Sequence, residues 1–269
     1  MKKFSILCAA LAALLGAPLP ASTPAWADLQ VDVNQGNIQP LPIAVPDFVP
    51  GGPNDAQAAA NIAGVVRADL ERSGLFRPLD QRGFTEHITN INTVPNFPSW
   101  RAINAQGLVT GQVTQQPDGR LRVDFRLWDV YGDSQMLGLQ FFTTPENWRR
   151  IAHMVSDAIY ERITGEKGYF DTRVVFISES GPATKRVKRL AIMDEDGANP
   201  IFLTRGDYMV LTPRFNPTAQ MIAYMSYIGS KPRIYLFDIE TGKQEKLGAV
   251  SIAGSVVRRL MARVRRSIR

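Results

Sequence analysis

The first half of the chain alternates between segments with strand-like and helix-like spacing of apolar residues. Residues 43–45 form a short apolar run between prolines, which is typical of a buried strand. Residues 54–74 then place apolar side chains on one stripe at helical spacing. Asn54 and Gln57 fit a capping box at the start of this helix, and Gly74 fits a left-handed cap at its end. The pattern predicts a strand followed by a helix.

Three more strands and a second helix complete this region. Residues 107–114, 121–127 and 135–143 read as strands, the second with strict alternation of polar and apolar positions. A helix is predicted over residues 144–165, with threonine as its cap, proline in its first position and glycine at its end. Strand, helix, three strands and helix predict a compact N-terminal α/β domain of the sandwich type over residues 28–168.

From residue 173 the pattern changes to short strands that repeat. Residues 174–178 match residues 221–226, and residues 189–194 match residues 233–238, which are offsets of 47 and 44 positions. The blade of a β-propeller repeats every ~40 to 45 residues. We therefore expect an α+β chain in which residues 169–250 form the first one to two blades of an incomplete propeller.

The N-terminus has the pattern of a secretory signal peptide. Two lysines precede an apolar run over residues 4–15, and Ala25, Trp26 and Ala27 give a small-x-small cleavage site. Residues 1–27 are the expected signal peptide, cleaved between Ala27 and Asp28. The run is shorter than the roughly 20 residues of a membrane span. We expect an exported chain without a membrane span, and without cysteine because Cys8 is removed.

The positive charge is concentrated in residues 251–269, which hold six arginines and no acidic residue, against a formal net charge of +6 for the chain. The charge therefore gives no support for nucleic-acid binding by the folded body. The segment fits either a basic amphipathic helix at an anionic membrane or a frameshifted translation product. We favour the second, an aberrant tail, because the segment begins where the next repeat is due.

Motifs for catalysis, cofactors or metals are not apparent in the sequence. His87 and His153 are the only histidines, and neither has a nearby cluster of histidine or acidic ligands that suggests a metal site or a triad, so both are expected to be structural or solvated. Residues 193–199 do not meet the calcium-loop pattern and fit a turn between strands better. The sequence predicts a protein that is not an enzyme, with no catalytic residue, cofactor or metal.

Six blocks of the sequence together resemble TolB, the periplasmic component of the Tol-Pal system. They are residues 43–48, 65–80, 109–118, 152–173, 194–199 and 213–217. The resemblance implies an α/β domain followed by a six-bladed propeller, located in the periplasm. It also implies a non-enzymatic adaptor between TolA of the inner membrane and Pal of the outer membrane, which maintains envelope integrity and supports outer-membrane constriction in cell division.

The first residues after the expected cleavage site are the candidate partner-binding segment. They alternate polar and apolar side chains, as does a strand that adds to a partner's sheet edge or a strand of the domain itself. The resemblance favours a switchable segment that faces TolA in one state and is docked in the other. The candidate residues are Asp28, Leu29, Gln30, Val31, Asp32 and Val33.

The sequence departs from the family pattern near residue 250. Six blades need on the order of 250 residues, and about 75 precede the departure. Because open blades leave strand edges unpaired, we expect residues 173–250 to be poorly stable and Pal binding to be lost. The alternatives are a fragment of a propeller-containing serine peptidase, which would require a downstream hydrolase domain, or a frameshifted product without function.

Overall fold

The computed structural model describes residues 29–30, 39–229 and 231–249. The N-terminal domain contains β1 (Leu41–Ala44), β2 (Val49–Pro50), α2 (Ala56–Arg72), β3 (Phe76–Pro78), α3 (Phe97–Ala102), β4 (Gly107–Gln115), β5 (Leu121–Asp129), β6 (Ser134–Thr143) and α4 (Trp148–Thr164). The following blade region contains β7 (Arg173–Ser180), β8 (Val187–Asp194), β9 (Ile201–Phe202), β10 (Val210–Phe215), β11 (Met221–Ser226), β12 (Arg233–Asp238) and β13 (Gln244–Ala249). The predicted signal peptide, residues 31–33 and the arginine-rich segment 251–269 lie outside the described residues.

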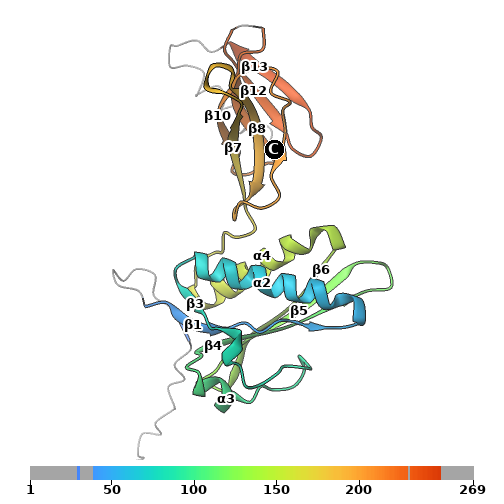
Figure 1. The fold of residues 1–269 in the computed structure, drawn as a ribbon, viewed down its shortest axis with the longest axis vertical. Coiled ribbons are helices and arrows are strands. Elements are labelled where there is room, and N and C mark those ends of the chain that lie inside the picture. Colours follow the sequence, from blue (N-terminus) through green and yellow to red (C-terminus); the bar gives the residue numbers. More distant parts are fainter. Residues whose placement is uncertain (1–28, 31–38, 230, 250–269) are drawn as a thin grey trace, which may run out of the picture.

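A mixed sheet in the order β3-β1-β4-β5-β6 forms the centre of the N-terminal domain (Figure 1). β1 runs parallel to both of its neighbours, with Leu41 opposite Phe76 and Ile43 opposite Gly107. β4, β5 and β6 are antiparallel to one another. The short β2 pairs with the far end of β4. The strands expected from alternation are confirmed, and β2 and β3 are additions that are too short to give a periodic signal.

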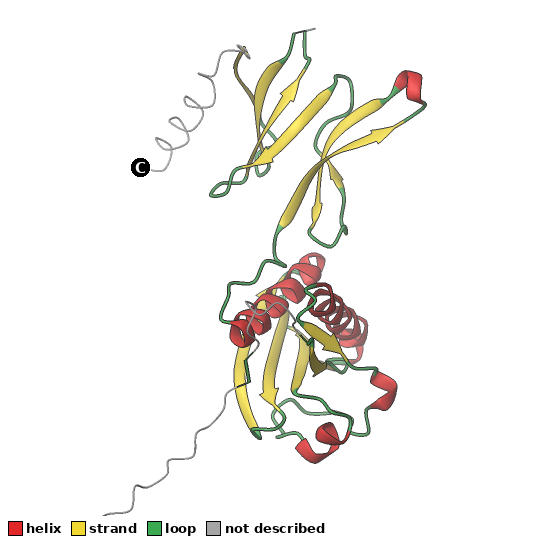
Figure 2. Cartoon of the chain, turned by 90° about the vertical axis from the view of Figure 1, so that its left-hand side faces the viewer, coloured by secondary structure: helices red, strands yellow, loops and turns green. Residues whose placement is uncertain are grey.

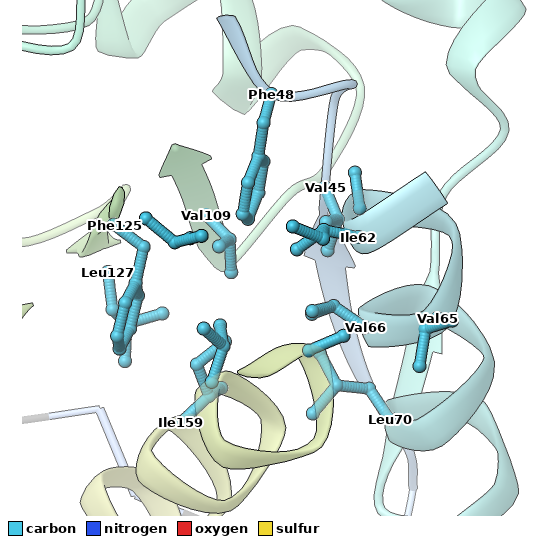
Figure 3. Close-up of a cluster of buried hydrophobic side chains, with 14 of the residues drawn as sticks. Val45, Phe48, Ile62, Val65, Val66, Leu70, Val109, Phe125, Leu127 and Ile159 are labelled. Carbon is cyan, nitrogen blue, oxygen red and sulfur yellow. The ribbon is translucent and has the colours of Figure 1, made fainter. Parts of the chain in front are cut away.

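Alternate residues of the strands feed two cores on opposite faces of this sheet. On one face, Ile43 and Val109 belong to the larger core, which α2 and α4 cover (Figure 3). On the other face, Ala44 and Leu108 pack with Trp100 of α3 in a smaller core. The two faces explain why β1 reads as a continuous apolar run rather than as an alternating one.

The ends of the helices differ in part from the expected caps. A short 3-10 turn at Pro53–Asp55 precedes α2, and no side chain caps the helix start. Gln57 Nε2 instead donates to Asn61 Oδ1 at 2.8 Å, so the predicted capping box is wrong. Because Pro53 begins the turn, Asn54 lies inside it and not at the cap position. The left-handed Gly74 is confirmed, with a φ of 72°, and Gly165 ends α4 as expected, also in the left-handed region with a φ of 75°.

The blade region consists of two antiparallel sheets, one of β7, β8 and β9 and the other of β10 to β13 (Figure 2). The sequence repeat corresponds to β7 with β11 and to β8 with β12. Both sheets contribute to one core, with Leu190 and Ile192 from the first packed with Ile222, Tyr224 and Phe237 of the second. The fold class is confirmed: an α/β domain precedes small antiparallel sheets of the kind that make propeller blades. Over the described residues, no helix has the length and apolar character of a membrane span.

Candidate functional site at the junction of the domain and the blades

Two residues of the predicted partner-binding segment are described. Leu29 is half-buried and packs against the larger core of the N-terminal domain, whereas Gln30 is exposed. Asp28 and residues 31–33 lie outside the described residues. The assignment of this segment to a partner stays a prediction.

The turn between β8 and β9 contacts α2 and α4, on the side of the N-terminal domain that faces the blade region (Figure 1). Two backbone hydrogen bonds form this turn. The Asp194 N–H donates to the Ala198 carbonyl at 2.9 Å, and the Gly197 N–H donates to the Asp194 carbonyl at 3.0 Å. Gly197 has a φ of 87°, which a glycine adopts without strain. The Glu195 N–H donates to the Thr172 carbonyl at 3.2 Å, which ties the turn to the segment after α4.

Three ion pairs join this turn and the end of β8 to the helices, and the longest of them joins Arg149 Nε to Asp194 Oδ2 at 3.9 Å. Arg72, at the end of α2, pairs with Glu195, and Arg149, at the start of α4, pairs with Asp196. Burial raises the pKa of Glu195 above its ordinary value even though Arg72 opposes this shift. For Asp196, burial also acts to raise the pKa, but the Ala198 N–H and Arg149 outweigh it, and the pKa is lowered. The turn is therefore held by charged contacts that are partly shielded from solvent.

A buried pair, His153 and Asp69, lies next to these ion pairs. His153 Nδ1 is 2.8 Å from Asp69 Oδ2, and the two side chains are 3% and 0% exposed. Asp69 also accepts from Arg72 at 3.2 Å, which connects the buried pair to the surface of the junction. Burial lowers the pKa of His153, but the hydrogen bond and charge of Asp69, together with Asp196, outweigh it and raise the pKa.

A cavity of about 390 Å³ opens beside this cluster. Its lining includes Arg149, His153, Asp171 and Asp194. His153, Asp194 and Asp196 offer one ligand atom each within 4.8 Å of one another, so the junction groups ligand types that could hold a metal ion.

The expectation that neither histidine has a nearby cluster of acidic ligands is wrong for His153. His87 is exposed, whereas His153 faces three carboxylates supplied from distant segments. Asp69 is 84 positions away in the sequence, so no local motif could reveal the cluster. One signal was available: Asp69 interrupts the apolar stripe of α2 between Val66 and Leu70, and a charged residue on a buried face requires a partner.

A second, smaller cavity of about 230 Å³ lies within the blade region. Tyr224 and Ser226 of β11 contribute to its lining. The side-chain oxygen atoms of both residues are buried without a hydrogen-bond partner among the described residues. This cavity contains unpaired hydroxyl groups but no charged cluster like that of the junction.

Both regions of the chain match known protein families. Residues 29–136 match the family described as the TolB amino-terminal domain, and residues 160–256 match the family described as the TolB beta propeller domain. TolB from Acinetobacter baumannii, known from a crystal structure, is 30% identical with a TM-score of 0.68, covering 83% of this chain and 53% of that chain. This chain thus spans about half the length of that relative.

Two further structures are similar to part of the chain at low identity. The C-terminal domain of LpoB from Salmonella enterica is 12% identical with a TM-score of 0.32, covering 40% of this chain and 86% of that chain. A PelC dodecamer subunit from Paraburkholderia phytofirmans is 13% identical with a TM-score of 0.33, covering 52% of this chain and 99% of that chain. These similarities are too low to bear on function.

Proposed function

Since the chain belongs to the TolB family, which is generally non-enzymatic, we propose that it is a periplasmic adaptor that links TolA of the inner membrane to Pal of the outer membrane. In this role it maintains envelope integrity and supports constriction of the outer membrane in cell division. The observation that carries the proposal is the match of an amino-terminal domain and a propeller domain of TolB in the same chain and in family order. Because the chain spans about half of a solved relative, the partners are proposals for this chain.

The proposed contact with TolA is the segment from Asp28 to Val33. Leu29 supports a docked state, because it packs against the core of the N-terminal domain although it precedes the first strand, which begins at Leu41. The alternation of the segment supports a free state in which it adds a strand to an exposed sheet edge of TolA, where backbone hydrogen bonds give affinity and alternate side chains set the register.

Titration of the purified chain with the periplasmic part of TolA tests this contact. Replacing the apolar positions together, Leu29→Asp, Val31→Asp and Val33→Asp, should weaken TolA binding by at least about tenfold if these side chains fill pockets along the edge. The matched control replaces the alternate positions, Gln30→Asn and Asp32→Asn, and should bind as the unmodified chain does. Failure of the unmodified chain to bind TolA would overturn the proposed partner.

The blade region is the proposed Pal-facing part, and the expected loss of Pal binding in a chain with two sheets stays a prediction. Titration with Pal, alongside a TolB that contains six blades, measures it directly. Pal affinity equal to that of the six-bladed protein would show that the two sheets described here carry the whole contact.

A further inference from the structure

One imidazole nitrogen at the junction is buried without a partner. His153 Nδ1 lies 2.8 Å from Asp69 Oδ2, and an ionised carboxylate only accepts, so Nδ1 carries the donated proton. The other nitrogen, Nε2, has no hydrogen-bond partner and is enclosed by protein atoms. A histidine fixed in this way by a buried carboxylate, with its second nitrogen unpaired, has the arrangement of a metal ligand and its supporting group.

We propose that His153, Asp194 and Asp196 bind one divalent transition-metal ion, which fastens the first blade sheet to α4. Their ligand atoms already lie within 4.8 Å of one another. Ligands at about 2.1 Å from a tetrahedral zinc ion are roughly 3.4 Å apart, so binding requires the three ligand atoms to move closer to one another by at most about 1.4 Å. Two of the three ligands come from the turn of the blade region and one from the helix, so the ion connects the two regions.

The charges at the junction favour a cation. We count the charged residues that line the cavity together with the charged residues of the neighbouring ion pairs. Among these described residues, carboxylates outnumber guanidinium groups. The carboxylates belong to Asp69, Glu146, Asp171, Asp194, Glu195 and Asp196, and the guanidinium groups to Arg72, Arg149, Arg150 and Arg173. The carboxylates exceed the guanidinium groups by two, so the junction is negative before any charge on His153 is counted, which favours a divalent cation.

Arg149 does not fill the site by itself. It pairs closely with Asp196. Its ion pair with Asp194 is longer, with Nε 3.9 Å from Oδ2, beyond hydrogen-bond distance, so this buried Nε has no hydrogen-bond partner. Asp194 Oδ2 accepts from Asn199 Nδ2 at 2.7 Å, and Asp196 Oδ1 accepts from the Ala198 N–H at 3.0 Å, so both carboxylates are oriented by their own turn. Such orientation lowers the cost of assembling the ligands.

The donor set selects the class of ion. One imidazole nitrogen with two carboxylate oxygens suits zinc or manganese, whereas calcium takes about six to eight oxygen ligands. Three protein ligands leave a coordination position for water, and the cavity of about 390 Å³ beside His153 provides access for it. We therefore expect the site to bind zinc more tightly than calcium, and zinc is the probe for the tests.

Calorimetric titration of the chelator-treated full chain with zinc alone tests the proposal, and one ion per chain is the expected stoichiometry. Asp194→Asn removes a ligand and should weaken zinc binding by at least about tenfold, and Asp69→Asn should weaken it by about 10 to 100-fold through the orientation of His153. The matched controls are Asp207→Asn and His87→Gln, both at exposed positions, which should leave the affinity unchanged. Equal effects of the controls and the junction variants would overturn the site.

Nitrogen-15 NMR of the imidazole rings tests the same site without a substitution in the junction. The chain has only two histidines, so the two rings are readily distinguished with His87→Gln. We expect His153 to be protonated on Nδ1 alone in the zinc-free chain at pH 7.5, and its Nε2 resonance to shift with one equivalent of zinc. A His153 ring that carries protons on both nitrogens and does not respond to zinc would overturn the proposal and assign the site to a proton. Neither readout involves TolA or Pal, so the metal site and the adaptor role can fail independently.

Discussion

At the scale of single residues, the hydroxyl group of Tyr224 is an unfavourable feature of the blade core. The side chain is 2% exposed and its Oη has no hydrogen-bond partner among the described residues. Burial raises the pKa of Tyr224 to about 12. An unpaired buried hydroxyl costs about 1 to 3 kcal/mol. Tyr224→Phe should therefore leave the blade region as stable as before or raise its free energy of unfolding by about 1 kcal/mol, measured by urea unfolding.

A matched control for this prediction is Tyr235→Phe. Tyr235 lies opposite Tyr224 on the neighbouring strand, is 7% exposed, and its hydroxyl is not among the unpaired buried groups. Its replacement should not be stabilising. A loss of more than about 1 kcal/mol in Tyr224→Phe would mean that an ordered water in the smaller cavity satisfies the hydroxyl.

Asp157 gives the N-terminal domain a defined pH dependence. It lies half-buried on α4 and accepts from the Phe170 and Asp171 N–H groups at 2.7 and 3.1 Å. Burial is the main influence, and it raises the pKa against the effect of these hydrogen bonds. The folded chain thus holds this proton more tightly than the unfolded chain, whose pKa is about 3.9. This contribution to stability is complete below the unfolded pKa and is lost as the pH rises through the folded pKa.

Asp157→Asn removes that titration. The stability of the unmodified chain relative to the variant should decrease as the pH rises from about 4 to 7, as followed by urea unfolding at each pH. A difference that instead grows with pH would show that the two backbone hydrogen bonds outweigh burial.

At the scale of elements, β4 depends on a glycine beneath an aromatic ring. A Cβ atom at Gly111 would lie 2.4 to 2.6 Å from ring atoms of Phe48, well inside contact distance. Gly111→Ala should therefore reduce the free energy of unfolding by about 3 kcal/mol, since a filled core does not absorb an added group. Thermal unfolding measures this, and the double variant with Phe48→Leu should recover part of the loss.

Gly64 in α2 provides the opposite control for this prediction. Its backbone is helical, and the nearest atom to an added Cβ is the end of the Arg67 side chain at 3.7 Å. Gly64→Ala should stabilise the domain by up to about 1 kcal/mol, because alanine is the better helix former. Equal destabilisation by both substitutions would argue against a specific clash with Phe48.

The elements that the sequence predicted are those with a long periodic signal. The strands at β4, β5 and β6 and the spans of α2 and α4 agree with their apolar patterns. α3 was missed because six residues make less than two helical turns and its Phe97 and Trp100 give no repeat. The junction was missed for a different reason: it joins residues of α2, α4 and the turn at Asp194, and such contacts depend on the tertiary fold.

At the scale of the whole molecule, the ion pairs of the junction should couple unfolding of the two regions. Trp100, Trp128 and Trp148 all lie in the N-terminal domain, and no tryptophan follows them in the sequence, so tryptophan fluorescence of the chain after residue 27 reports on this domain and tyrosine signals report on the blades as well. In the double variant Arg72→Ala with Arg149→Ala, we expect the free energy of unfolding of the blade region to fall by about 1 to 2 kcal/mol. The unfolding transition of the blades should then separate from the one that tryptophan fluorescence reports.

Arg82→Ala with Arg120→Ala is the control for that experiment. These arginines form ion pairs with Asp80 and Asp118 on the surface of the N-terminal domain, where the exposed fractions of the side chains range from 50% to 90%. Exposed pairs contribute little, so the transitions should remain as in the unmodified chain. Coincident transitions in the junction variant would show that the ion pairs do not couple the two regions.

The predicted N-terminal domain ends at residue 168, but its core extends further. Phe170 is fully buried in the larger core, and Asp157 accepts from the backbone of residues 170 and 171. A fragment of residues 28–172 should unfold cooperatively and be more stable than residues 28–168 by about 3 kcal/mol, the typical cost of removing a buried phenylalanine side chain. Equal stability of the two fragments in urea would place Phe170 outside the cooperative unit.

The position of β1 in the sheet also determines the order in which the sheet can form. β1 comes first in the chain, yet its partners follow much later, since Leu41 pairs with Phe76 and Ile43 pairs with Gly107. The hairpins of β4, β5 and β6 close over short turns and are the faster contacts to make. We therefore expect the centre of the sheet to be completed last, with the edge of β4 unpaired until β1 joins it. On this order, we expect a newly made chain to be most prone to aggregation before its first strand is paired.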